Sequence, residues 1–253
     1  MVTFSEAQLL AWITPLLWPF LRVLAVFTAL PVLGTRTVPT RVRIALAGFV
    51  AFAAQPSLPE MPTVALDSAL AFALVAQQVL IGLSIGFAVR VVFTAVEFAG
   101  ELIGLQMGLN FAGFFDPISA STATATSRFF GTTVAWLFIV INGHLIVIGA
   151  LVQSFQAFPV GAEPFAFLRQ AAPQRWGAEI FATGLWIAMP LVAMLLFVNF
   201  VLGAISRVAA QINIFAVGFP ITLGVGLVGL LLTLPAMQAP FTMALERLLA
   251  TFQ

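Results

Sequence analysis

Long apolar runs dominate the chain and are separated by short segments rich in proline, glycine and arginine. A helix needs about 20 residues to cross the hydrocarbon core of a bilayer, so the second run is short unless it begins as early as Val38. The pattern predicts an all-α integral membrane protein of about six long hydrophobic helices in hairpins, forming one domain over residues 1–253. The runs cover approximately residues 9–33, 44–55, 68–109, 129–155, 176–202 and 212–234, and an amphipathic tail follows at about 240–253.

Composition strengthens the membrane assignment and excludes several classes of function. The 253 residues are 62% hydrophobic and 8% charged, with a mean hydropathy of +1.12, whereas about a quarter of the residues in a soluble domain are charged. A net charge of +1 gives no basis for binding nucleic acid. The absence of cysteine excludes disulfides and thiolate metal sites, and we expect neither a metal nor a cofactor.

The third run carries charges that a lipid-facing helix would avoid. On a helix, Arg90, Glu97 and Glu101 fall on one face, and charges at membrane depth normally face protein or water. Arg128, Arg207 or arginines of a partner chain are candidates to meet the carboxylates. One interpretation is a polar path or an interchain ion network, and the other is the water-exposed end of an over-long helix.

Glycines recur at a spacing of four on the same run. Small residues at this spacing allow helix backbones to approach closely, which predicts dense protein packing with partner chains or ordinary packing within the chain. The stripes comprise Gly82 and Gly86, and then Gly100, Gly104 and Gly108.

The segment that follows, at about 106–127, is neither a regular span nor a solvated loop. It combines large apolar residues with glycines and Asp-Pro, a turn signal, and ends in a small polar flank. Irregular backbone at membrane depth is tolerated only where protein or a water-filled cavity surrounds it, and hydrophobic constrictions close pores by dewetting. A pore closure is one interpretation, and a re-entrant loop that only fills space is the other. Its candidate residues are Gln106, Met107, Gly108, Phe111, Gly113, Phe114, Phe115, Asp116 and Pro117.

No catalytic arrangement emerges from the polar residues. The only histidine, His144, has no neighbouring serine or aspartate in the sequence, and a lone intramembrane histidine is either a proton relay or, more often, a hydrogen-bonded structural residue. The segment 206–220 places Arg207 and two amides before an apolar run, and it either lines a channel or forms an interfacial turn. We therefore expect that the chain is not an enzyme.

Six motifs in order resemble one known family over essentially the whole chain: the FliR/SctT export-gate family of type III secretion systems. The most specific is GELIGLQMGLNFAGFFDP, and one motif alone would carry little weight. The motifs are WPFLRVLAVFTALPVLGTRTVPTRVRIALA (18–47), QQVLIGLSIGF (77–87), GELIGLQMGLNFAGFFDP (100–117), NGHL (142–145), PVGAEP (159–164) and AAQINIFAVGFP (209–220).

The resemblance implies an all-helical subunit of a cone-shaped, hetero-oligomeric gate in the bacterial inner membrane, at the flagellar basal body. It implies assembly with several copies of FliP and FliQ, association with FlhB and FlhA, contact with membrane lipid, and passage of unfolded flagellar proteins as transient cargo. It also implies that residues 106–117 form a plug in the closed channel. Alternatives are the equivalent subunit of a virulence injectisome and, from intramembrane charges alone, a small-molecule secondary transporter.

Overall fold

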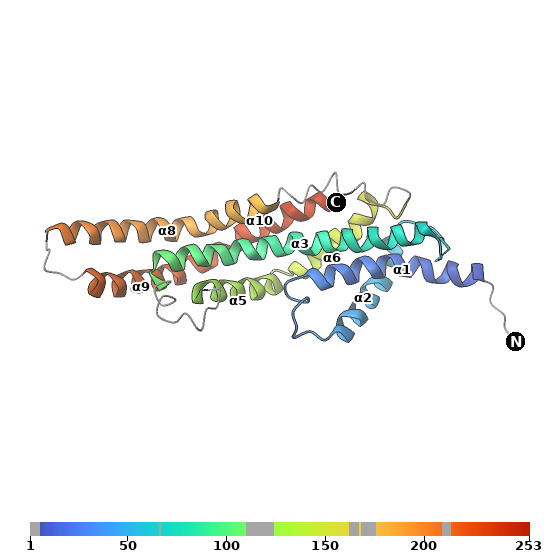
Figure 1. Ribbon diagram of the computed structural model, residues 1–253, viewed down its shortest axis with the longest axis horizontal. Helices are drawn as coiled ribbons and strands as arrows, with labels where there is room; N and C mark the ends of the chain where they lie inside the picture. The colour runs from blue at the N-terminus through green and yellow to red at the C-terminus, as the bar shows by residue number, and fades with distance from the viewer. Residues whose placement is uncertain (1–5, 66, 110–123, 162–166, 168–175, 209–213) are drawn as a thin grey trace. The chain divides into compact units, whose positions relative to one another are not determined.

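Helices make up nearly all of the regular structure, as the apolar pattern predicts. The computed structural model describes residues 6–65, 67–109, 124–161, 167, 176–208 and 214–253, and these contain no strand. The helices are α1 Glu6–Ala29, α2 Thr40–Ala54, α3 Ala69–Gln106, α5 Ala125–Val140, α6 Gly143–Ala157, α8 Trp176–Val208, α9 Ile214–Thr233 and α10 Gln238–Leu249, with short 3-10 turns η1 Gln55–Ser57, η4 Leu234–Met237 and η5 Ala250–Phe252 (Figure 1).

Not every apolar run forms a described helix that is long enough to cross a membrane. Among the described residues, four helical stretches are long and apolar enough to cross a membrane, and α5 with α6 adds a fifth if the broken pair counts as one span. The second apolar run is too short to cross the membrane as a helix, because α2 has only 15 residues, which is about 22 Å of helix. The four stretches are Trp12–Ala29, Ala69–Gln106, Trp176–Val208 and Ala216–Phe252.

The fourth apolar run is interrupted by a single backbone feature. Asn142 separates α5 from α6 with a φ of 56°, in the left-handed region that asparagine tolerates better than most residues. The amides of Leu145 and Ile146 then donate to the Asn142 carbonyl as α6 begins. The break therefore comes from the Asn-Gly pair of the NGHL motif. The histidine of the same motif, His144, is exposed in the first turn of α6.

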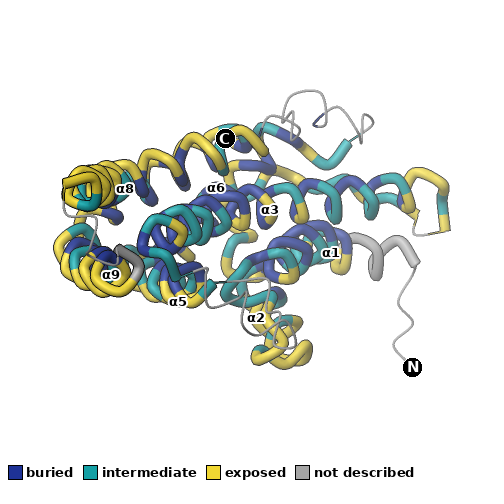
Figure 2. Tube along the Cα trace, turned by 60° about the vertical axis from the view of Figure 1, so that its left-hand side comes forward, coloured by how far each residue is buried: buried dark blue, intermediate teal, exposed yellow. Residues whose placement is uncertain are grey.

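The chain divides into two compact units. The first comprises Met1–Val91, Ile141–Trp176 and Leu245–Gln253, and the second comprises Val92–Val140 and Gly177–Ala244. Helix α3 contributes its first part to one unit and its second part to the other. Figure 2 shows buried stripes along α1 and α3, and much wider exposed surfaces on α2, α8 and α9.

In the first unit, α1 packs closely against α3. A Cβ added at Gly82 would meet the backbone oxygen of Arg22 and the side chain of Ala25, and one added at Gly86 would meet Ala29. Glycine at these two positions therefore sets how near the two backbones lie.

Arg22 is the polar centre of this unit and is fully buried. Its Nε donates to Oε1 of Gln78 at 2.8 Å, and its two terminal nitrogens donate to Oγ of Ser154 and to the carbonyl of Phe158, both at 2.9 Å. The guanidinium carbon lies 3.6 Å from the ring centroid of Phe155. Arg22 thus ties α1 to α3 and to the end of α6.

The partners of Arg22 explain how a cation is tolerated there. Phe158 is the residue at which α6 ends, and the C-terminal end of a helix carries partial negative charge that favours a cation. The aromatic face of Phe155 adds a cation–π contact. Gln78 in turn donates to Gln77, which donates to the carbonyl of Pro159, so the network extends into the connection after α6.

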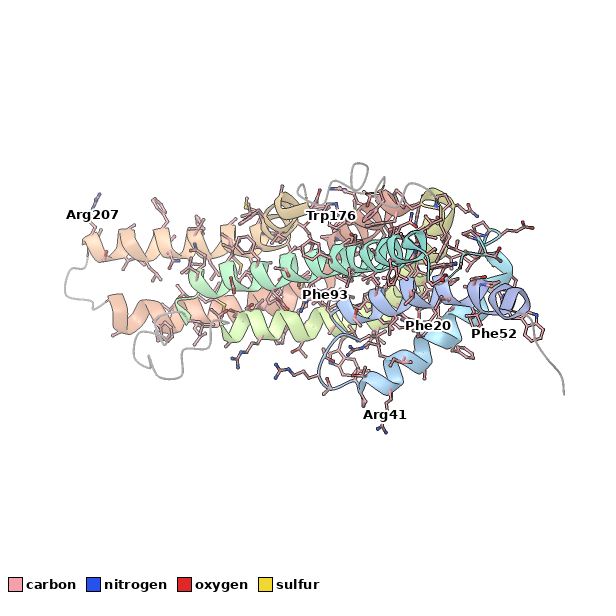
Figure 3. The ribbon with its side chains drawn as sticks, turned by 45° about the vertical axis from the view of Figure 1, so that its right-hand side comes forward. Phe20, Arg41, Phe52, Phe93, Trp176 and Arg207 are labelled. Atoms are coloured by element: carbon pink, nitrogen blue, oxygen red, sulfur yellow. The ribbon has the colours of Figure 1, made fainter. Side chains whose placement is uncertain are left out.

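Aromatic pairs fill the core of the second unit. Phe93 of α3, labelled in Figure 3, makes edge contacts with Phe138 of α5 and Phe241 of α10, with ring centroids 5.6 and 5.8 Å apart. Gly184 of α8 lies against the backbone of Ala95, where a Cβ would be 2.7 Å from its oxygen. Aromatic packing and close helix approaches therefore both hold the second unit together.

Replacing Arg22 with methionine should lower the free energy of unfolding of the full chain by about 3 kcal/mol, because buried acceptors left without a donor cost roughly 1–3 kcal/mol each. The free energy of unfolding of Arg22→Lys should lie between those of the wild type and Arg22→Met, because an ammonium keeps the charge but lacks the planar arrangement of donors of a guanidinium. Denaturant unfolding in detergent, followed by circular dichroism, measures both. Arg90→Met is the matched control because Arg90 is exposed, and equal losses in Arg22→Met and Arg90→Met would contradict the role given to Arg22.

Candidate functional site

The segment with the most distinctive sequence, at about residues 106–127, begins at the end of α3. Helix α3 ends at Gln106, Met107 is completely buried, and Gly108 has a φ of 80°. Leu109 follows, and α5 begins at Ala125. The remaining candidate residues of the plug, Phe111, Gly113, Phe114, Phe115, Asp116 and Pro117, lie outside the described residues.

Gly108 terminates α3 in the manner expected of a glycine that follows a helix. The amide of Met107 still donates to the Ile103 carbonyl at 2.9 Å, and that of Gly108 donates to Leu105 at 3.1 Å. A left-handed residue directly after the last turn is a common helix end, and glycine adopts it without a steric penalty. The chain therefore turns off the α3 axis at a position where other residues would be strained.

Met107 anchors the end of α3 against α9. A Cβ added at Gly226 would lie 2.5 Å from Cγ of Met107, so the missing side chain of Gly226 makes the space that Met107 fills. Methionine is flexible and fills irregular gaps well.

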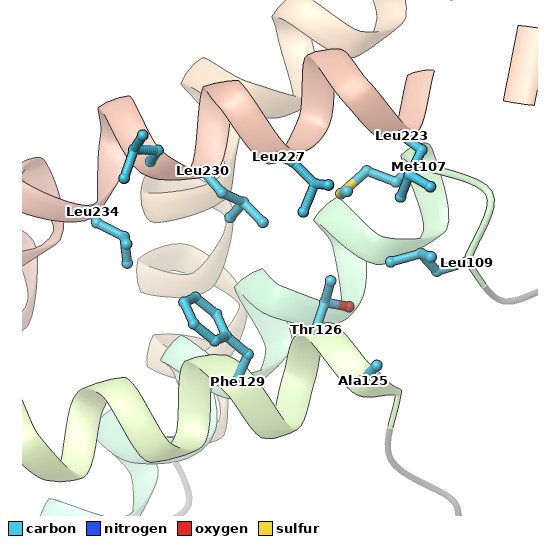
Figure 4. A pocket seen from close by; sticks show the side chains of 10 residues that line it. Met107, Leu109, Ala125, Thr126, Phe129, Leu223, Leu227, Leu230 and Leu234 are labelled. Atoms are coloured by element: carbon cyan, nitrogen blue, oxygen red, sulfur yellow. The ribbon is translucent and has the colours of Figure 1, made fainter. Parts of the chain in front are cut away.

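An apolar cleft of about 420 Å³ opens beside this anchor, between the end of α3, the start of α5 and α9 (Figure 4). The one polar side chain in its lining is Thr126, whose hydroxyl hydrogen-bonds the hydroxyl of Thr124 at 3.1 Å. The cleft therefore suits apolar groups. Its lining is Met107, Leu109, Ala125, Thr126, Phe129, Leu223, Leu227, Leu230, Leu231 and Leu234.

The two ends of the distinctive segment flank this cleft. Leu109 is the last described residue before it and Ala125 is the second after it, and both line the cleft. The leucines of α9 escaped the sequence interpretation although they carry a signal. Positions 223, 227, 230, 231 and 234 follow the three- and four-residue spacing of one helix face.

The charged residues of α3 differ in their surroundings. Glu97 and Glu101 are half-buried, and Arg90 is exposed. The carboxylate of Glu97 lies against Gly131 of α5, because a Cβ added at Gly131 would be 3.0 Å from Oε1 of Glu97. Arg207, a candidate partner in the sequence, is exposed in the last turn of α8 and points away from the helices (Figure 3).

The glycines in the second half of α3 also face α5. A Cβ at Gly100 would meet the backbone of Thr126 and the ring of Phe130, and a Cβ at Gly104 would meet the Thr126 hydroxyl. The small residues thus bring α5 close to α3 just where the cleft begins.

In the described part of the chain, no three histidine or acidic side chains come together as metal ligands.

Comparison with known proteins settles the family. A family model described as bacterial export proteins, family 1, matches residues 13–248. The chain belongs to this family. It is 42% identical to the flagellar biosynthetic protein FliR of Escherichia coli K12 over 95% of this chain and 92% of the relative.

Two further relatives of this export family carry the same description. The FliR protein of Pectobacterium carotovorum is 40% identical over 93% of this chain and 90% of its own length. That of Aquifex aeolicus is 33% identical over 87% and 85%. The similarity covers α1 through α10, which confirms the resemblance read from the six motifs.

Gly108→Ala should lower the free energy of unfolding of this bacterial export protein by about 1 kcal/mol, because alanine is disfavoured in the left-handed region. Gly203→Ala is the matched control in the same unit. It lies inside α8 with nothing within 4 Å of an added Cβ, so it should raise stability by roughly 0.5–1 kcal/mol. Denaturant unfolding in detergent compares the two, and a Gly108→Ala variant as stable as Gly203→Ala would contradict the helix-ending role.

Proposed function

We propose that this chain is a structural and gating subunit of the flagellar type III protein-export channel in the bacterial inner membrane, at the flagellar basal body. It helps to form and close a pore for unfolded flagellar proteins and catalyses no reaction itself. Its proposed partners are several copies of FliP and FliQ, together with FlhB and FlhA. Membership of the bacterial export family and the FliR relatives support the export apparatus.

The apolar cleft at the end of α3 is the observation that carries the gating part of the proposal. Leu109 and Ala125, which stand on either side of residues 110–123 in the sequence, line the cleft, and the phenylalanines of residues 110–123 match its apolar lining in chemistry. Gly108 gives the chain a turn that needs no side-chain rearrangement. We propose that residues 106–117 form the plug, with Phe111, Phe114 and Phe115 as the part that excludes water.

Assembly with partner chains is supported by the length and exposure of α8. Its 33 residues extend about 50 Å, whereas the hydrocarbon core is about 30 Å thick. No side chain from Leu196 to Val208 is buried within the chain, and Phe197 and Phe200 are 68% and 75% exposed. Lipid cannot cover all of this apolar surface, so other apolar helices are proposed to cover the rest.

The carboxylates of α3 belong to the same proposal. Charges at membrane depth persist when they face protein or water, and Glu97 already lies against α5. We propose that Arg90, Glu97, Glu101 and Arg207 contribute to assembly or to the polar path.

Replacing both Phe114 and Phe115 with alanine should raise leakage of small solutes through the assembled channel, because the closure loses the apolar surface that expels water. Ion or dye flux in cells that express the co-assembled complex measures the leak, and native mass spectrometry checks assembly. The control is the Phe72→Ala, Phe219→Ala double variant, which removes two other exposed phenylalanines, one on α3 and one on α9. A variant at 114 and 115 that assembles normally and leaks no more than wild type would exclude the plug.

A further inference from the structure

Helix α2 and the turn before it form a surface that the export function leaves unexplained. The helix buries only Ala47 and Ala51, and it packs on α1 within the first unit. Phe49 and Phe52 are 71% and 67% exposed. At about 22 Å, α2 is too short to cross the bilayer, so its exposed apolar side is not part of a membrane span.

Two arginines stand at the start of this surface without partners. Arg43 is used internally, because it donates to the carbonyls of Leu33, Thr35 and Val38 and so holds the turn. Arg36 and Arg41 are exposed, and among the described residues neither guanidinium has a hydrogen bond or an ion pair. The sequence contains no acidic residue between positions 30 and 59, so the chain offers no local counter-charge.

The helix places the cation and the apolar residues on one side. At 100° per residue, Arg41, Phe49 and Phe52 fall within an arc of about 80°, opposite the side that holds Ala47 and Ala51. Phe49 and Phe52 lie roughly 12 and 16 Å further along the axis than Arg41. Arg41 projects outward from α2 in Figure 3.

This spacing matches a phospholipid better than a soluble ligand. A guanidinium binds a phosphate through paired N–H donors, and the acyl chain of the same lipid extends from the phosphate by a distance similar to that between Arg41 and the two phenylalanines. Gly48 lies about 20° beyond Arg41 at the edge of this arc, and nothing lies within 4 Å of a Cβ added there. The surface therefore has a cationic end, an apolar flank and an open notch between them.

We propose that α2 is a binding surface for an anionic phospholipid, with its phosphate on Arg36 and Arg41 and one acyl chain along Phe49 and Phe52. Two unpaired cations favour a headgroup with net negative charge over a zwitterionic one, because the phosphate of a zwitterionic lipid already carries its own counter-charge. The proposal assigns a lipid to a defined face of the chain, which the export function does not require.

Native mass spectrometry of the full chain, co-expressed and purified with its genomic neighbours, tests this surface directly. The probes are phosphatidylglycerol and phosphatidylcholine added to the detergent-solubilised complex. Arg36→Gln with Arg41→Gln should reduce retained phosphatidylglycerol by roughly tenfold or more and leave phosphatidylcholine unchanged. The control, Arg128→Gln with Arg247→Gln, removes the same charge from two other exposed arginines and should retain phosphatidylglycerol like wild type.

A second variant tests the apolar half of the site with both arginines intact. Gly48→Leu has room in the folded chain and should displace the acyl chain, so it should also lower phosphatidylglycerol retention. Equal retention of phosphatidylglycerol by the Arg36 and Arg41 double variant and by its control would overturn the proposal. A wild-type complex that retains more phosphatidylcholine than phosphatidylglycerol would overturn it too. Loss of a co-purifying protein with lipid retention unchanged would assign the surface to an acidic partner and overturn it as well.

Discussion

An apolar medium offers no hydrogen bonds, so every polar group within it has to be satisfied by the protein. Arg22 shows how the first unit meets this constraint. Its side chain reaches Gln78 on α3 and both Ser154 and Phe158 at the end of α6, and the aromatic face of Phe155 covers its plane. One buried cation therefore fixes where three helices meet, and it does so with neutral partners.

The second unit depends on close packing of small and apolar residues around a cleft. Small residues bring α3 close to α5 and α9, at Gly100, Gly104 and Gly226. Met107 fills the gap that remains, and Gly108 turns the chain away. Packing of this kind leaves an apolar cleft open at the rim of the proposed plug. A closure built from apolar contacts can separate without leaving buried hydrogen bonds unmade, which suits a pore that has to open.

The sequence predicted the helical class because long apolar runs are local signals, whereas the plug at residues 106–117 stays a prediction. The run pattern did not show the short length of α2 or the break at Asn142, because both depend on a few residues within otherwise apolar stretches. The partners of Arg22 could not be predicted from the sequence, because Gln78, Ser154 and Phe158 lie 56 to 136 positions away from Arg22 along the chain. The leucine face of α9 was readable from its spacing, but uniformly apolar helices give no contrast by which one face stands out.

The account rests on the claim that the exposed apolar helices, above all the end of α8, are covered by other chains. Native mass spectrometry of the chain, gently extracted after co-expression with its genomic neighbours, tests that claim most directly. We predict one defined hetero-oligomer in which this chain is bound to several copies of small apolar membrane proteins. A stable monomer or homodimer, recovered while those neighbours are present and folded, would contradict it.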